Sequence, residues 1–291
     1  MKKRITNLMA LCTLISFGVT AQIQTPAPSP AGSVYSKVGL TDVTIEYSRP
    51  KVKGRKIFGE GSDFLQPYGQ LWRAGANAGS KITLSTDATI GGKEVKAGTY
   101  MIYMTPGASS FSFKLYSDLT LGGNVKGYDA ANEVISVDAT ATKQSSSTEA
   151  LTYNISDISA DNTSANIELA WADVSVKVPI KVNFDETVMA DIAAKTQVRP
   201  GNYVAAATYY LATGKDLNKA LEWMNLYLAV EGNSKQFWNV HTKAQILAKL
   251  GMKKEAIATA EESMNTAKSN EGGDFGYIKR NQDLIAEVKG K

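Results

Sequence analysis

Apolar and polar residues alternate along much of the chain between residues 33 and 184. In the clearest example, residues 174–184, every second residue is apolar, and polar residues such as Lys177 and Lys181 lie between them. Successive side chains of a β-strand point to opposite faces, so this pattern predicts a strand with one buried and one solvated face. The same alternation recurs in five shorter segments, at residues 43–47, 111–115, 135–139, 151–155 and 167–171.

Turn-forming sequences separate these segments. They include Gly91-Gly92, the glycine-rich run that begins at Gly122, and Asp161-Asn162. Many short strands with one buried face and regular turns are typical of antiparallel β proteins. We therefore expect residues 33–184 to form an all-β antiparallel sandwich or barrel of about eight to ten strands.

From Asp185 onward the spacing of apolar residues becomes helical. Asp185 is placed to cap a helix that continues to Ala194, and the sequence Arg199-Pro200-Gly201 then interrupts the pattern. Residues 185–201 are thus predicted to be a linking helix and loop. Residues 202–291 are predicted to form an all-α domain of helical hairpins, with helices near residues 202–213, 217–230, 235–250, 253–268 and 275–289.

The middle four helices carry two copies of one pattern. Small residues recur where two helices would cross, and a glycine lies at each turn, with a shift of 36 or 37 residues between the copies. This pattern resembles tetratricopeptide repeats. Fewer than three repeats rarely fold alone, so we expect them to pack on the β domain or to be capped by the flanking helices. The matching positions are Tyr203, Ala206, Ala207, Tyr210, Gly214, Ala220 and Met224 in the first copy, and Val240, Lys243, Ala244, Leu247, Gly251, Ala256 and Ala260 in the second.

The N-terminus has the pattern of a secretory signal. Three cations precede an apolar run of about a dozen residues and a small-residue exit, which predicts cleavage after Ala21. Residues 22–32 then form a tether, and the mature protein is expected in the periplasm or secreted. The only cysteine, Cys12, lies in the signal, so disulfides and thiolate metal sites are not expected. No later segment is apolar enough to predict a transmembrane helix.

Charge and motifs exclude several classes of function. The formal charge of +4 includes three cations of the signal, which leaves about +1 for the mature chain, too little for a general nucleic-acid or membrane binder. His241 is the only histidine, and we expect a packing or surface role for it. Neither a G-x-S-x-G elbow nor a phosphate-binding glycine loop is present, so we expect no cofactor and no metal.

Three acids, Asp118, Asp129 and Glu133, flank a glycine-rich turn and are interpreted as turn-stabilising residues, with acid/base work or calcium binding as alternatives.

Positive charge is concentrated in residues 49–56, where five of eight residues are cationic and none is acidic. Arg49, Lys51, Lys53 and Arg55 share the parity of the apolar residues before them. If the strand continued unbroken, these side chains would line one mouth of the sandwich and suit a carboxylate, phosphate or acidic sugar. The alternative is a solvated hairpin tip whose charges keep an edge strand from pairing with other chains.

The segment at residues 70–77, QLWRAGAN, is a second candidate site. Trp72 offers a flat apolar face, Arg73 a planar set of donors, and Asn77 both a donor and an acceptor, which together suit a sugar or a small polar ligand. The alternative is a structural corner in which Trp72 fills the core, Arg73 binds loop carbonyls and Asn77 closes a turn.

Three sequence runs resemble one bacterial family. YSRPKVKGRKIFG, LQPYGQLWRAGANAGSKITLSTD and GGKEVKAGTYMIYMTP are similar to the family called domain of unknown function 2911. The resemblance covers residues 29–184 and is strongest between residues 47 and 103. It implies an exported all-β domain, to which some members append a helical region. No activity is established for the family, so the resemblance implies no catalytic residues.

Three hypotheses of function follow. The leading one is an exported, non-enzymatic binding module that holds a small anionic or sugar-like ligand in a polar, cationic pocket and engages a protein partner through its helical tail. The second is a periplasmic hydrolase that acts on a glycan or ester with Arg73 and a carboxylate such as Asp118 or Glu133. The third is a structural or adaptor protein in which exposed aromatic residues of the helices, such as Tyr210 or Trp238, recognise the partner. The candidate ligand-binding residues are Arg49, Lys51, Arg55, Trp72, Arg73 and Asn77.

Overall fold

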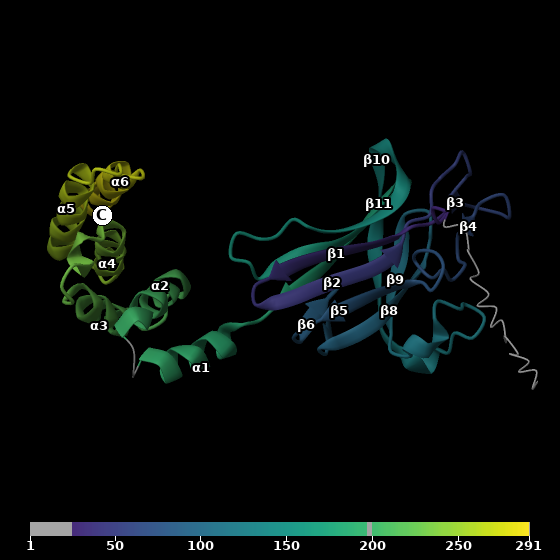
Figure 1. The fold of residues 1–291 in the computed structure, drawn as a ribbon, viewed down its shortest axis with the longest axis horizontal. Helices are drawn as coiled ribbons and strands as arrows, with labels where there is room; N and C mark the ends of the chain where they lie inside the picture. Colours follow the sequence, from purple (N-terminus) through teal and green to yellow (C-terminus); the bar gives the residue numbers. More distant parts are fainter. Residues whose placement is uncertain (1–24, 197–199, 291) are drawn as a thin grey trace, which may run out of the picture. The chain divides into compact units, whose positions relative to one another are not determined.

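The structure, a computed structural model, describes residues 25–196 and 200–290. The predicted signal, residues 1–21, lies outside the described residues, as do the first residues of the predicted tether. The chain divides into two compact units with the boundary between Asn183 and Phe184, which we call the β unit and the helical unit (Figure 1). The prediction of an antiparallel β fold followed by an all-α region is confirmed.

The β unit is built around one nine-stranded antiparallel sheet. Two further strands, β3 (Phe58–Gly59) and β4 (Gln66–Pro67), form a small parallel pair in the segment that connects β2 to β5. In spatial order, the nine strands are β1 (Ala31–Val38), β2 (Thr41–Ser48), β5 (Ser80–Leu84), β8 (Gly98–Thr105), β9 (Ser110–Tyr116), β10 (Glu133–Ser156), β11 (Ser164–Val182), β6 (Ala88–Ile90) and β7 (Lys93–Val95).

The two longest strands fold the sheet over on itself. The first part of β10 pairs with β9, whereas its last part pairs with β11, and the register shifts twice between Lys143 and Thr152. Tyr47 of β2 and Tyr153 of β10 meet edge to face with ring centroids 5.0 Å apart, so the far half of the β10–β11 hairpin packs against β2. The sheet is not closed into a continuous barrel, because β1 and β7 remain its two edges.

The core of the β unit follows the predicted alternation. Phe111, Phe113 and Leu115 of β9 are buried, while the residues between them face outward. Opposite them, Leu169 and Trp171 of β11 are also buried. Burial of such side chains is the main favourable term in folding, and here it fixes which face of β8, β9 and β10 remains outside to carry polar groups.

The helical unit contains six α-helices among the described residues. Its repeat pattern has structural meaning, because Ala206, Ala220, Ala244 and Ala256 are all buried where helices pack together. Flanking helices complete both hairpins: Ile192 packs in the same cluster as Ala206 and Ala220, and Val288 packs with Leu247 and Ala256. Assignment of these hairpins to tetratricopeptide repeats stays a prediction. The helices are α1 (Asp185–Thr196), α2 (Tyr203–Thr213), α3 (Leu217–Leu228), α4 (Phe237–Lys249), α5 (Lys253–Lys268) and α6 (Tyr277–Gly290).

Both hairpin turns use glycine for a conformational reason. Gly214 and Gly251 have φ values of 68° and 77°, in the left-handed region where a side chain is disfavoured.

Among the described residues, no helix combines the length and apolarity needed to cross a membrane.

Candidate functional site

The cationic segment does not continue the buried face of β2. The strand ends at Ser48, and Pro50, which has no N–H to donate, is buried two residues later. After Pro50 the alternation changes parity, so that Lys51, Lys53 and Arg55 are exposed. The segment then crosses to β10, where Leu151 N donates to Pro50 O at 2.9 Å and Val52 N donates to Glu149 O at 2.8 Å.

Arg49 joins β2 to β10. Its Nε donates to Leu151 O at 3.2 Å, and its Nη2 donates to Thr152 Oγ1 at 2.9 Å. Gly32 passes directly beneath it, because a Cβ on Gly32 would lie 3.0 Å from Arg49 Cδ. Half-buried and bonded in this way, Arg49 supports the sheet edge rather than projecting into solvent.

Residues 51–56 form a tight turn that we call the cationic turn. Lys53 and Gly54 have φ values of 47° and 70°, and Arg55 N donates to Val52 O at 3.0 Å. The Arg55 guanidinium also donates to the carbonyls of Lys51 and Val52, which holds it across the turn. Lys51, Lys53, Arg55 and Lys56 are all exposed, and none of them forms an ion pair with a described residue.

Trp72 lies in the core. It is only 4% exposed, its ring stacks on Trp171 with centroids 5.7 Å apart, and its Nε1 donates to Gly75 O at 3.1 Å. Its backbone pairs with Met104 of β8 through two 2.8 Å hydrogen bonds. The apolar face that the sequence offers is therefore covered by protein.

Arg73 and Asn77 lie at the surface end of the same segment, residues 72–79, which we call the corner. Arg73 Nη1 donates to Asn77 O at 2.7 Å, and this is the only hydrogen bond of its guanidinium within the described part of the chain. Asn77 Nδ2 donates to Ser48 Oγ at 3.1 Å and to Ser29 O at 3.2 Å. The candidate residues thus form two groups, Arg73 with Asn77 beside Ser48, and Lys51 with Arg55 in the cationic turn.

The corner packs against the loop at residues 117–132, whose base is closed by a 3.0 Å hydrogen bond from Ser117 N to Asn132 O. Two glycines make this approach possible. A Cβ on Gly123 would lie 2.9 Å from backbone atoms of Ala78 and Gly79, and a Cβ on Gly79, whose φ is 81°, would lie 3.1 Å from Gly123 Cα. The conformational freedom of Gly79 therefore serves contact with this loop.

Beneath the loop lies a cluster of three tyrosines. The rings of Tyr116 and Tyr128 stack at 4.6 Å, and Tyr103 meets both rings edge on. Burial raises the pKa of the Tyr103 hydroxyl, and the charge of Arg73 opposes that rise. Arg73 consequently lies near this cluster, on the side of the sheet opposite to Trp72.

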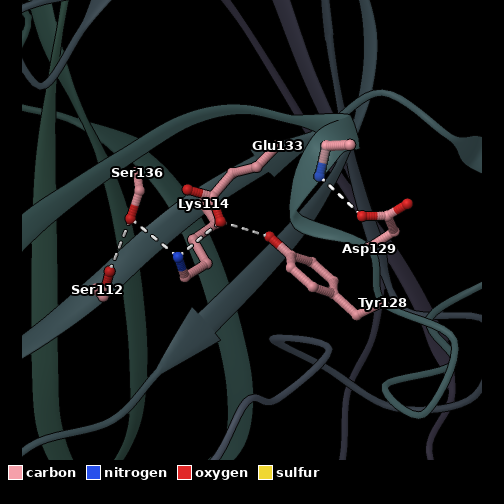
Figure 2. A network of polar contacts seen from close by, with 7 residues as sticks. Ser112, Lys114, Tyr128, Asp129, Glu133 and Ser136 are labelled. Atoms are coloured by element: carbon pink, nitrogen blue, oxygen red, sulfur yellow. Dashed lines mark hydrogen bonds and ion pairs between the residues drawn. The ribbon is translucent and has the colours of Figure 1, made fainter.

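A polar network extends from Tyr128 along the outer face of β9 and β10 (Figure 2). Lys114 Nζ donates to Glu133 Oε2 at 2.7 Å and to Ser136 Oγ at 3.0 Å, and Ser136 Oγ lies 3.0 Å from Ser112 Oγ. Tyr128 OH donates to the same Glu133 oxygen at 2.7 Å. The Lys114 and Glu133 side chains are 18% and 20% exposed, so this is a largely buried ion pair.

The network is arranged for stability rather than for acid/base catalysis. Burial alone would raise the pKa of Glu133, but hydrogen bonds from Lys114 and Tyr128 and the Lys114 charge outweigh it and hold the pKa below its usual value. Burial and the Glu133 contact raise the pKa of Tyr128. Lys114 donates to both of its partners, so it is not placed to accept a proton from Ser136.

The two other acids near the glycine-rich turn stabilise local structure. Asp118 Oδ1 accepts hydrogen bonds from Thr120 N at 2.9 Å and Thr120 Oγ1 at 2.6 Å, and Asp129 Oδ1 accepts one from Ala131 N at 3.0 Å. Within the described ranges, histidine, cysteine and acidic side chains do not gather in groups of three or more that would hold a metal ion.

The Lys114–Glu133 network was not predicted from the sequence. One signal was present, because Lys114 and Ser112 occupy the outward positions of a strand whose inward positions are Phe111, Phe113 and Leu115. A lysine there needs an anionic neighbour if a loop covers it.

A cavity of about 290 Å³ in the β unit is lined by residues of β6, β7 and the end of β11, and by none of the six candidate residues.

The β unit is thus a nine-stranded antiparallel domain with an exposed cationic turn and a corner in which Trp72 is buried and Arg73 lies at the surface. Residues 29–180 match the family described as "Protein of unknown function (DUF2911)". The chain belongs to this family. The match does not include the helical unit. No curated protein and no solved structure matches the chain.

Proposed function

We propose that this protein is an exported, non-enzymatic binding module whose β unit holds a small anionic ligand, such as an acidic sugar or a phosphate. The observation that supports this proposal is the cationic turn, which presents four exposed cations without an ionic partner among the described residues. Cations left unpaired at one turn attract anions, and two carbonyls hold the Arg55 guanidinium in one orientation before a ligand arrives.

In this proposal some candidate residues contact the ligand and others position the backbone around it. Lys51 and Arg55 contact the ligand, while Arg49 and Trp72 hold the surrounding backbone in place. Arg73 and Asn77 form a second polar contact region, in which Arg73 retains guanidinium donors beyond the one bonded to Asn77 O. Export requires cleavage near Ala21, and N-terminal sequencing of the mature protein tests that part of the proposal.

A charge-reversal experiment tests the cationic turn. We expect Lys51→Glu combined with Lys53→Glu to weaken binding of glucuronate or inorganic phosphate by about tenfold or more, because two attractive charges become repulsive. Isothermal titration calorimetry at low salt measures the change, and the wild-type affinity should fall as salt rises.

The matched control reverses two exposed cations elsewhere on the β unit, Lys126→Glu and Lys143→Glu, neither of which is ion-paired with a described residue. It makes the same change in net charge. Equal losses in both double variants, or no binding of either anion by the wild type, would contradict the proposal.

The helical unit is proposed to contact a protein partner. Trp238 is 41% exposed, whereas Tyr210 is buried. Phe275 is 66% exposed, has a φ of 46°, and stacks on Phe237 at 6.4 Å. A bulky residue in the left-handed region costs conformational energy, and such strain is concentrated at functional positions.

We expect Trp238→Ala combined with Phe275→Ala to remove one specific co-purifying protein identified by mass spectrometry from the exported fraction. The control variant, Leu226→Ala with Val230→Ala, alters two comparably exposed apolar residues of the same unit and should retain that protein. Loss in both variants, or in neither, would argue against recognition by these aromatic side chains.

A further inference from the structure

The helical unit contains an open cavity of about 490 Å³ between α4 and α6. Polar side chains from both helices line it, including His241 and Gln245 from α4 and Arg280 and Glu287 from α6. A second cavity of about 240 Å³ shares Gln245, Leu284 and Glu287 with the first. We call the larger cavity the groove, and the smaller cavity adjoins it.

His241 is buried at the wall of this groove, and a hydrogen-bond chain fixes its protonation pattern. Asn281 Nδ2 donates to Tyr277 O and to Ser263 Oγ, both at 2.8 Å. A carbonyl oxygen can only accept, so the atom that faces it must be the amide nitrogen and the other must be Oδ1. Oδ1 lies 2.7 Å from His241 Nδ1, which must then carry the proton.

The other imidazole nitrogen, Nε2, is consequently an acceptor. Nε2 has no hydrogen-bond partner among the described residues. It is nevertheless open to solvent rather than fully enclosed by protein. The His241 side chain itself is only 7% exposed. Burial lowers the pKa of His241; the hydrogen bond to Asn281 opposes this shift and the charge of Arg280 adds to it, and the net lowering favours the neutral imidazole. This nitrogen can accept a hydrogen bond from a ligand in the groove.

The charges of the groove compensate one another. Asp283 is ion-paired with Lys279 at 2.9 Å, and Arg280 is balanced in sign by Glu287. With Lys279 counted beside its partner Asp283, the charged residues of the groove sum to zero, and the groove offers many donors and acceptors. Such a lining favours a ligand that is polar, uncharged and rich in both donors and acceptors.

We propose that the groove between α4 and α6 binds a neutral oligosaccharide, with a sugar hydroxyl donating to His241 Nε2. Sugar hydroxyls supply donors and acceptors together, which matches Gln245, Arg280 and Glu287. Arg280 lies over the Tyr277 ring at 4.7 Å, and this contact holds its guanidinium at the His241 end of the groove. The adjoining smaller cavity shares Gln245, Leu284 and Glu287 with the groove, so a further sugar ring has room beside the first.

Calorimetric titration of the full mature protein with maltotriose, cellotriose and triacetylchitotriose tests this site. We expect at least one of these neutral sugars to bind with a Kd of about 1 mM or tighter. His241→Phe retains a planar ring but removes Nε2, and Gln245→Leu removes the amide at similar volume. Each change should weaken binding about five- to tenfold through the loss of one hydrogen bond.

Two controls separate this site from other effects. Glu261→Gln alters an exposed residue of α5 and should leave sugar binding unchanged. The variant with Lys51→Glu and Lys53→Glu should also bind the sugar normally, so a failure of the anion proposal does not affect this one. If His241→Phe does not fold, Gln245→Leu still tests whether the sugar binds in the groove. Saturation by none of the three sugars, undiminished binding in both groove variants, or binding only of trigalacturonate would overturn the proposal.

Discussion

Replacing Gly123 with alanine is expected to lower the free energy of unfolding of the β unit by about 3 to 5 kcal/mol. Gly123 has a φ of 77°, and an added Cβ would lie 2.9 Å from Ala78 C, Ala78 O and Gly79 N. All three are backbone atoms, so no side chain can rotate away to relieve the clash. Urea denaturation followed by tryptophan fluorescence measures the change.

Gly122 provides the matched control for this prediction. It is the adjacent residue, with a φ of 58°, and the nearest atom to an added Cβ is Thr120 O at 3.9 Å. Gly122→Ala therefore introduces left-handed strain without a clash and should cost only about 1 to 2 kcal/mol. Equal effects at both positions would show that the backbone contact between the corner and the loop at residues 117–132 does not hold them together.

This contact gives the glycine-rich sequence a structural role. The corner places Arg73 and Asn77 at the surface, and the loop covers the tyrosine cluster next to Arg73. If the contact is lost, Arg73 loses the neighbours that fix its position. A change at Gly123 should thus also alter any binding that depends on Arg73, without removing a polar group.

Local periodicity predicted both units correctly, because burial follows the repeat of side-chain direction within one element. The alternation at residues 111–115 placed Phe111 and Phe113 in the core, and the helical spacing placed Ala206 and Ala244 at helix contacts. His241 was expected to have a packing or surface role, and it is buried. Each of these features depends on residues that are close in sequence and belong to the same strand or helix.

The positions of the candidate side chains depended on contacts that are distant in sequence. Pairing of Pro50 and Val52 with residues 149–151 of β10 changes the parity after Arg49 and exposes Lys51. The side on which Trp72 points is decided by its pairing with Met104. Neither partner could be identified from local spacing, so the sequence located the two segments but not the direction of their side chains.

The Lys114–Glu133 ion pair likewise depends on a contact between residues that are distant in sequence. Its two charges lie at opposite ends of the loop at residues 117–132, and only the return of the chain brings them to 2.7 Å. Removing one partner leaves the other charge partly buried and unpaired, which costs more than the pair itself contributes. The consequence is a large expected effect from a single substitution.

We expect Lys114→Met to lower the free energy of unfolding by about 2 to 4 kcal/mol, because the Glu133 carboxylate keeps only Tyr128 as its side-chain donor. The double variant with Glu133→Gln should recover part of this loss, since it removes the unpaired charge. Lys96→Met, which breaks the well-exposed pair with Asp87, is the control and should have a much smaller effect.

The pH dependence identifies the ion pair as the cause. The folded-state pKa of Glu133 lies below its usual value of 4.5, so the unfolded state takes up its proton first as the pH falls. Its contribution to stability is therefore complete above about pH 4.5 and is lost as the pH falls through the lower folded-state pKa. The difference in unfolding free energy between wild type and Lys114→Met should shrink as the pH falls from about 5 through the lowered folded-state pKa of Glu133. A difference that stays constant over this range would mean that lost packing of the lysine stem, rather than the paired carboxylate, accounts for the destabilisation.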